Sequence, residues 1–225
     1  MADRTTETIP AARAAHGGAA DRGRLVDHFK RVYTIIAGLA ITEACRHLLP
    51  FAFDSWPGAS FWMFCTFFVT IVPIFQGGDR SLDIKYLYNP PTGPASRWLY
   101  IWDVYVLLVT ALLFVCTAES IPQLPPAPAA DPANFYYWMA IVLVFDAVAL
   151  AVDWLKSPAP QELRPYGLWI VLNAIVGVIC FIAAVSLSHA GVTMAPSLVA
   201  FGVFIVALAR TILDYAKSGR FMFPR

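Results

Sequence analysis

Ionisable side chains inside long apolar stretches are the residues of this chain with the greatest capacity for chemistry. An ionised group at the centre of a bilayer costs at least about 2.5–3.5 kcal/mol unless it is paired or hydrated, so each one needs an explanation. At a rise of 1.5 Å per helical residue, Glu43 and Asp146 lie about 18 Å inside their stretches, near mid-membrane, and Asp103 about 9 Å inside. Asn173 and Arg210 fall in the same third as Asp103.

These groups predict a polar path through a membrane. His47, near the opposite surface from Asp103, would receive a proton, which Glu43 and Asp146 would pass across the midplane to Asp103. Carboxylates and imidazoles suit this task because burial and partners move their pKa values into a working range. We therefore expect a translocation path that contains Glu43, His47, Asp103, Asp146 and Asn173.

Structural ion pairs are the alternative interpretation of the same side chains. Glu43 and Arg46 are spaced i, i+3 on one helical face, where such pairs neutralise each other. Asp103 and Arg210 lie at matching depth on separate stretches and form the second expected pair. Asp146 has no basic residue at its depth outside the first stretch, so packing explains it least.

A polar connection at residues 77–96 carries a third set of candidates. Asp79 and Asp83 are spaced i, i+4 and would hold Mg²⁺ for a reaction on a lipid phosphate, with Arg80 on the phosphate. A solvated helix start after the glycine pair, with Asp79 near its N-terminus, is the preferred explanation. The connection lacks the further carboxylates of a complete transferase motif, so no catalytic residue is assigned.

The histidines and cysteines do not indicate a cofactor. His47 and His189 share one level, but two histidines at helix ends are more typical of an interface than of bis-histidine haem ligation. The cysteines are single, lie in four different stretches and form no C-x-x-C pair: Cys45, Cys65, Cys116 and Cys180. We predict neither a cofactor nor a bound metal.

The elements that position these residues are six apolar helices. Of 225 residues, 59% are hydrophobic and 14% charged, well below the usual quarter charged. Runs of about 20 apolar residues cross a core of about 30 Å, and they occur at 32–53, 59–78, 98–118, 134–155, 166–188 and 194–216. The fold class is thus an all-α, polytopic six-helix transmembrane bundle at 32–216, with a loosely ordered tail at 1–31 and a short tail at 217–225. Small residues such as Ala147 and Ala151 would allow close helix contact.

Basic residues predict the orientation of this bundle. Of the 16 Lys and Arg residues, all except Arg46 fall on one side, which the positive-inside rule assigns to the cytoplasm together with both termini. A bacterial-type inner membrane is the expected location. The net charge of +1 excludes nucleic-acid binding based on charge.

Translocation of protons, a small ion or a small solute is therefore the leading functional hypothesis. The first alternative is a non-catalytic membrane subunit or scaffold that binds partner helices or lipid. The second and weaker alternative is a lipid-head-group enzyme that uses the connection at 77–96. The expected partners are the lipid bilayer and a homo-oligomer or larger membrane complex.

Overall fold

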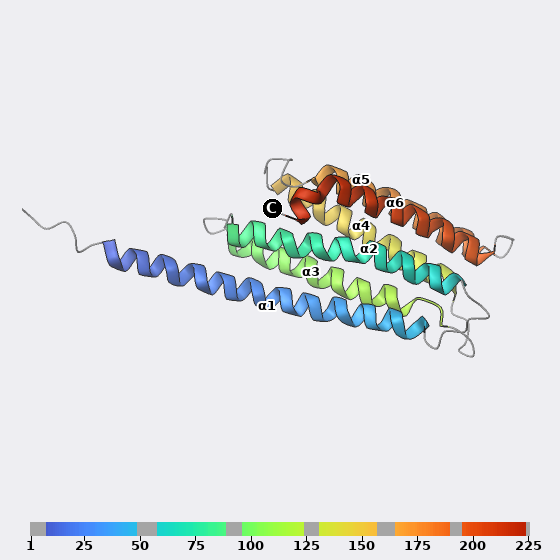
Figure 1. Ribbon diagram of the computed structural model, residues 1–225, viewed down its shortest axis with the longest axis horizontal. Coiled ribbons are helices and arrows are strands. Elements are labelled where there is room, and N and C mark those ends of the chain that lie inside the picture. The colour runs from blue at the N-terminus through green and yellow to red at the C-terminus, as the bar shows by residue number, and fades with distance from the viewer. Residues whose placement is uncertain are drawn as a thin grey trace, which may run out of the picture.

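The computed structural model describes residues 8–48, 58–88, 96–123, 131–156, 165–189 and 195–223 (Figure 1). Within these ranges the chain forms helices and no strand. The helices are α1 (Thr8–Leu48), α2 (Ala59–Leu82), the π-helical η2 (Asp83–Tyr88), α3 (Ser96–Glu119), α4 (Pro132–Lys156), α5 (Tyr166–Ser188) and α6 (Pro196–Met222). The all-helical class expected from the apolar stretches is confirmed.

Five helical segments are long and apolar enough to cross a membrane: Ala59–Tyr88, Arg97–Glu119, Pro132–Lys156, Tyr166–Ser188 and Pro196–Met222. The predicted span at 32–53 is not among them, because Arg31, Glu43 and Arg46 interrupt the most apolar part of α1 and residues 49–53 lie outside the described ranges. Within the tail predicted at 1–31, α1 is helical from Thr8, and its first part extends beyond the bundle (Figure 1).

The six long helices pack as a closed ring. α1 contacts α2 and α3, α3 contacts α4, α4 contacts α5, α5 contacts α6, and α6 returns to α2, which also contacts α3 and α4 across the ring. Small residues bring α4 and α5 together: Ala147 is buried, and a Cβ atom at Gly177 would lie only 3.4 Å from the Cβ of Leu143. Close approach of this kind supplies van der Waals packing that lipid-exposed helices depend on.

A proline in α2 fixes how this helix meets α6. Pro73 has no N–H, so the carbonyl of Val69, four residues earlier, loses its normal helical partner. The Thr211 hydroxyl on α6 donates to that carbonyl at 2.7 Å. The backbone group freed by the proline is therefore satisfied inside the protein, as a membrane interior requires.

The predicted polar connection at 77–96 is largely helical. Gly77 and Gly78 do not end α2, which continues to Leu82 and passes directly into η2. A side chain at Gly78 would meet the Leu107 side chain at 2.7 Å, so glycine permits the close approach of α2 and α3. Residues 89–95 of the connection lie outside the described ranges.

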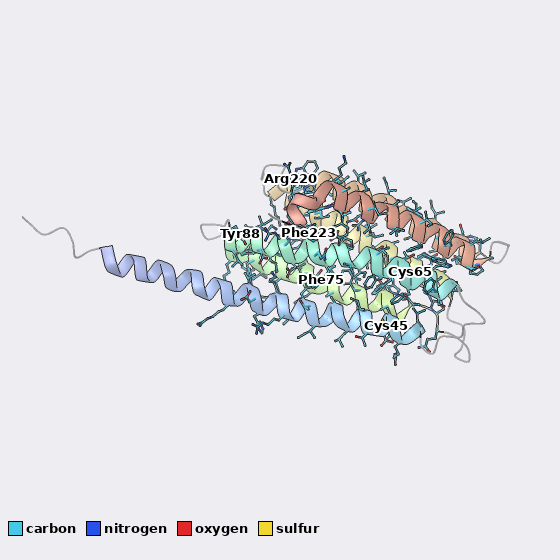
Figure 2. The ribbon with its side chains drawn as sticks, viewed as in Figure 1. Cys45, Cys65, Phe75, Tyr88, Arg220 and Phe223 are labelled. Atoms are coloured by element: carbon cyan, nitrogen blue, oxygen red, sulfur yellow. The ribbon has the colours of Figure 1, made fainter. Side chains whose placement is uncertain are left out.

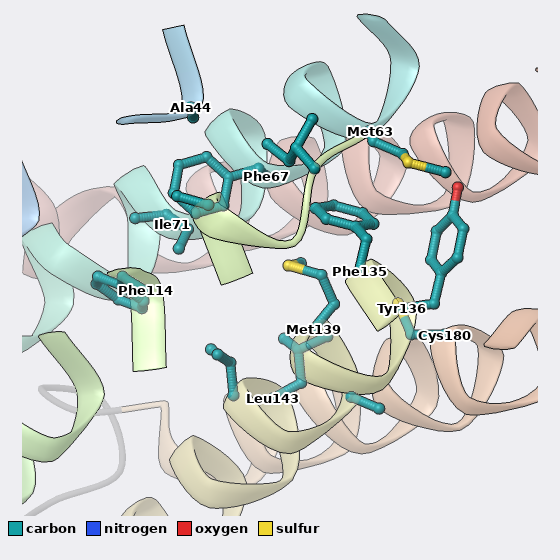
Figure 3. Packing of buried hydrophobic residues seen from close by; sticks show 14 of the residues in the cluster. Ala44, Met63, Phe67, Ile71, Phe114, Phe135, Tyr136, Met139, Leu143 and Cys180 are labelled. Atoms are coloured by element: carbon teal, nitrogen blue, oxygen red, sulfur yellow. The ribbon is translucent and has the colours of Figure 1, made fainter. Parts of the chain in front are cut away.

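Apolar side chains fill one half of the ring. They come from the C-terminal parts of α1, α3 and α5 and the N-terminal parts of α2, α4 and α6, and Figure 3 shows Phe67, Phe114, Phe135 and Met139 packed among them. Cys45 and Cys65 lie toward this end of the bundle, whereas Tyr88 and Arg220 lie at the other (Figure 2). The second half has a different interior.

Candidate functional site

A cavity of about 90 Å³, lined by apolar side chains and a group of charged ones, lies in the half of the ring opposite the apolar cluster. It is partly open and is lined by η2 and, among the described helices, by every one except α1. Its walls come from the C-terminal parts of α2, α4 and α6 and the N-terminal parts of α3 and α5, which all meet at one end of the bundle. About 10–15 Å³ suffices for one water, so several water molecules fit.

Lys85 joins three helices at one wall of the cavity. Its Nζ donates to Asp103 Oδ2 on α3 at 2.9 Å and to Asp153 Oδ2 on α4 at 2.5 Å. The next residue, Tyr86, donates its hydroxyl to the same Asp103 Oδ2 at 2.7 Å. Two consecutive residues reach one carboxylate from the π-helical segment η2, and π-helical turns often occur at functional sites.

A second polar chain lies deeper in the cavity. Arg210 on α6 donates through Nη2 to Asn173 Oδ1 at 2.5 Å, and Asn173 on α5 donates through Nδ2 to Asp146 Oδ2 on α4 at 2.6 Å. The amide of Asn173 thus connects a cation to a carboxylate that it does not touch directly. This arrangement gives Asp146 a hydrogen-bond donor and a nearby positive charge.

Asp214 holds Arg210 from the other side. Its Oδ2 lies 3.9 Å from Arg210 Nη1, while its Oδ1 accepts hydrogen bonds from Trp169 Nε1 at 2.7 Å and from Ser218 at 2.8 Å. Arg210 is only 5% exposed, yet its Nε and Nη1 have no hydrogen-bond acceptor among the described residues. Buried guanidinium N–H groups of this kind need water or another acceptor in the cavity.

The cavity is acidic overall. Asp103, Asp146, Asp153 and Asp214 all line it, against two cations, Lys85 and Arg210. With every group ionised, the lining carries two more negative than positive charges. A water-filled space with this balance favours cations over anions.

Three of the five residues predicted for the path line this cavity: Asp103, Asp146 and Asn173. Glu43 and His47 do not line it, and they lie together near the C-terminal end of α1, where His47 Nε2 is 2.9 Å from Glu43 Oε1. The path expected from depth alone is therefore divided into a cavity group and an α1 group. The apolar cluster occupies the half of the bundle that contains the α1 group.

The expected ion pairs have mixed outcomes. Arg46 Nε donates to Glu43 Oε1 at 2.8 Å, so that pair is formed. Asp103 and Arg210 both line the cavity, but Asp103 binds Lys85 and Tyr86 instead of Arg210. Lys85 was expected in a polar connection, but it lies in η2. This segment brings its Nζ within hydrogen-bonding distance of Asp103, which explains why Asp103 does not pair with Arg210.

Asp79, Arg80 and Asp83 lie on α2 and η2 instead of a loop. Lys30 on α1 is 3.0 Å from both Asp79 Oδ2 and Asp83 Oδ2, and Arg80 lies over the Tyr88 ring. Burial lowers the pKa of Lys30, but the hydrogen bonds and charges of the two aspartates outweigh it and the pKa is raised. A charged ammonium thus occupies the position where the Mg²⁺ hypothesis placed a cation.

Lys85, Asp153, Asp214 and Trp169 are polar cavity residues that were in neither the predicted path nor the predicted ion pairs. Helical spacing contained a usable signal for two of them. Asp153 follows Asp146 by seven residues and Asp214 follows Arg210 by four, which places each pair on one helical face. Lys85 had no such signal, because its position depends on the continuation of α2 through two glycines.

No family model matches the chain, and no curated protein or solved structure is significantly similar to it. Function must therefore be inferred from the site.

Proposed function

We propose that this protein translocates protons, or another small cation, across a membrane through the cavity that ends at Asp146. The strongest support is the hydrogen-bonded chain from Arg210 through Asn173 to Asp146, which lines a cavity large enough for several waters. A carboxylate in a membrane interior is tolerated when neutral and exchanges its proton when water reaches it.

The size of the cavity limits what passes. Pockets for drug-sized ligands measure about 300–1,000 Å³, whereas this cavity of about 90 Å³ holds a few waters. The acidic lining adds a preference for cations. These two properties favour a proton or small ion over a larger solute.

The apolar cluster would act as the barrier in this proposal. Phe67, Ile71 and Leu143 are buried, at positions of α2 and α4 that lie between the helix starts at the Glu43 and His47 end and the cavity-lining residues. Passage from His47 to Asp146 then requires a second conformation or a transient chain of water through the cluster. Glu43 and His47 would form the outer part of that path.

The orientation belongs to the same proposal. We place six spans, including α1, in a bacterial-type inner membrane, with both termini and the mouth of the cavity on the cytoplasmic side, because basic residues concentrate there. Cysteine labelling tests this with two exposed sites, Gln123→Cys and Lys217→Cys. Position 217 should react only from the cytoplasm and position 123 only from outside.

The direct test is flux in liposomes. Purified protein should carry protons in response to a pH gradient or membrane potential, and Asp146→Asn should abolish this, since the amide keeps the shape and cannot titrate. Asp27→Asn, at an exposed position on α1, is the control and should retain wild-type flux.

Liposomes that stay tight to protons and to a screen of small cations would refute the transport proposal. Stable co-purification with a larger membrane complex would then favour the subunit alternative. A lipid-head-group enzyme has less support, because Asp79 and Asp83 already bind Lys30.

A further inference from the structure

A group of three potential metal ligands lies at the opposite end of the bundle from the cavity. Glu43 and His47 come from the end of α1, and Glu119 is the last residue of α3. One ligand atom from each lies within 4.8 Å of the other two. His47 Nε2 is 2.9 Å from Glu43 Oε1 and 3.8 Å from Glu119 Oε2.

The helices explain why these side chains converge. Glu43 and His47 are spaced i, i+4 and therefore share one face of α1. α1 packs against α3, and the C-terminal ends of both helices lie at the same end of the bundle (Figure 1). Glu119 thus meets the last turn of α1.

The second ring nitrogen of His47 supplies independent support. His47 is 3% exposed, and its Nδ1 donates to the backbone carbonyl of Ile121, just beyond α3. Metal-binding histidines almost always donate their other ring N–H to a carbonyl or carboxylate, which fixes the tautomer and directs the free nitrogen at the metal. In His47 the other nitrogen, Nε2, faces the carboxylates of Glu43 and Glu119.

The spacing of the ligand atoms fits a small transition ion. Zinc bonds of 2.0–2.2 Å in tetrahedral geometry separate neighbouring ligand atoms by about 3.4 Å. The two separations measured from His47 Nε2, 2.9 and 3.8 Å, fall on either side of this value. Small side-chain rotations would equalise them.

We propose that Glu43, His47 and Glu119 form a binding site for a divalent transition ion of the zinc class. Three protein ligands leave a fourth position open to water or to a substrate. The Glu119 side chain is 56% exposed, so the ion reaches the site from the surface. The site lies at the other end of the bundle from the cavity. Glu43 and His47 also belong to the outer part of the proposed path, but ion binding at this site does not require flux.

Arg46 makes the proposal more specific. It binds the same Glu43 oxygen that faces His47, but its side chain is 65% exposed and is free to turn into solvent when an ion binds. Its charge opposes a divalent cation. Arg46→Gln should therefore tighten binding, by about tenfold for charges a few ångström apart near water.

Zinc titration of the chelator-treated full chain in detergent tests the site, with calorimetry and thermal unfolding as readouts. Wild-type protein should bind one Zn²⁺ and unfold at a higher temperature when it is bound. Ca²⁺ should bind weakly, because imidazole is a poor ligand for it. His47→Gln should abolish the Zn²⁺ response.

His189→Gln is the matched control, since His189 is an exposed histidine that bonds its own helix through the Val185 carbonyl. It should bind Zn²⁺ as the wild type does. If His47→Gln fails to fold, Glu119→Gln decides, because that position is exposed and its loss should still weaken binding at least tenfold. Absence of stoichiometric binding, or equal affinity of the wild type and Glu119→Gln, would overturn the proposal.

Discussion

The half of the bundle that contains the N-terminal parts of α2, α4 and α6 is packed with apolar side chains, whereas the other half encloses ions and amides. The same helices pass through both halves, and apolar contacts such as those in Figure 3 pack them together in the first half. Buried ion pairs add little net stability over apolar packing. The polar half therefore calls for an explanation other than stability, and hydration with ion passage provides one.

The largest effect should come from Arg210, the most buried cation of the polar half. Arg210→Met leaves Asp214 without its positive neighbour and should lower the free energy of unfolding by about 3–5 kcal/mol. Thermal unfolding in detergent measures this. Arg220→Gln, at an exposed position on the same helix, is the control.

Adding Asp214→Asn to Arg210→Met should recover part of the loss, because the buried charge is removed together with its partner. Strictly additive losses would show that the two side chains do not depend on each other.

Matched polar substitutions compare the two halves directly. Met139→Gln places an amide of similar size in the apolar cluster without a partner, at a cost of about 1–3 kcal/mol. Leu150→Gln places the same amide at the cavity wall, where water is available, and should cost clearly less. Equal losses in unfolding experiments would mean that the two halves are equally dry.

Thr211 tests the contact between α2 and α6. Thr211→Val removes the donor to the Val69 carbonyl and should cost about 1 kcal/mol, the usual scale for hydrogen bonds between membrane helices. In a Pro73→Ala background the restored N–H satisfies that carbonyl, so the same substitution should cost almost nothing. A cost that is unchanged by Pro73→Ala would indicate another role for the hydroxyl.

The smallest effect should occur at Lys30, outside both halves. Its side chain is partly exposed, and pairs of that kind contribute about 0.2–1 kcal/mol. Lys30→Met should lower stability by that amount, and high salt should reduce the difference between variant and wild type. A loss of several kcal/mol would contradict a peripheral role.

Much of the fold follows from the sequence, because apolar length and alternation with polar connections fix where helices run. Five of the six predicted stretches coincide with helices that are long and apolar enough to span a membrane. The helical state of 79–88 did not follow, since two glycines normally weaken a helix. The stabilising contacts come from other helices, through Lys30 and through Leu107, which packs against Leu82 and Tyr86. Tertiary context overrode local propensity there.

The site was partly predictable for a related reason. Depth along a helix placed Asn173 and Arg210 at the level of Asp103, with Asp146 nearer mid-membrane, because the rise per residue is fixed. All four line the cavity. Depth does not show which helices are adjacent. The prediction from depth therefore paired Asp103 with Arg210 and placed Glu43 in one path with the cavity residues. The order of the helices explains both differences. α3 and α6 are not adjacent in the ring, and α1 contributes no described residue to the cavity lining.

Side-specific cysteine modification tests the central claim. One half of the bundle should contain water that enters from one side of the membrane, and the other half should exclude water. In a background without the four native cysteines, Ala149→Cys lines the cavity and Ala111→Cys lies in the apolar cluster. A small charged thiol reagent should modify position 149 from the cytoplasmic side alone and leave position 111 unmodified from either side. Equal rates at the two positions, or an inert position 149, would contradict the account.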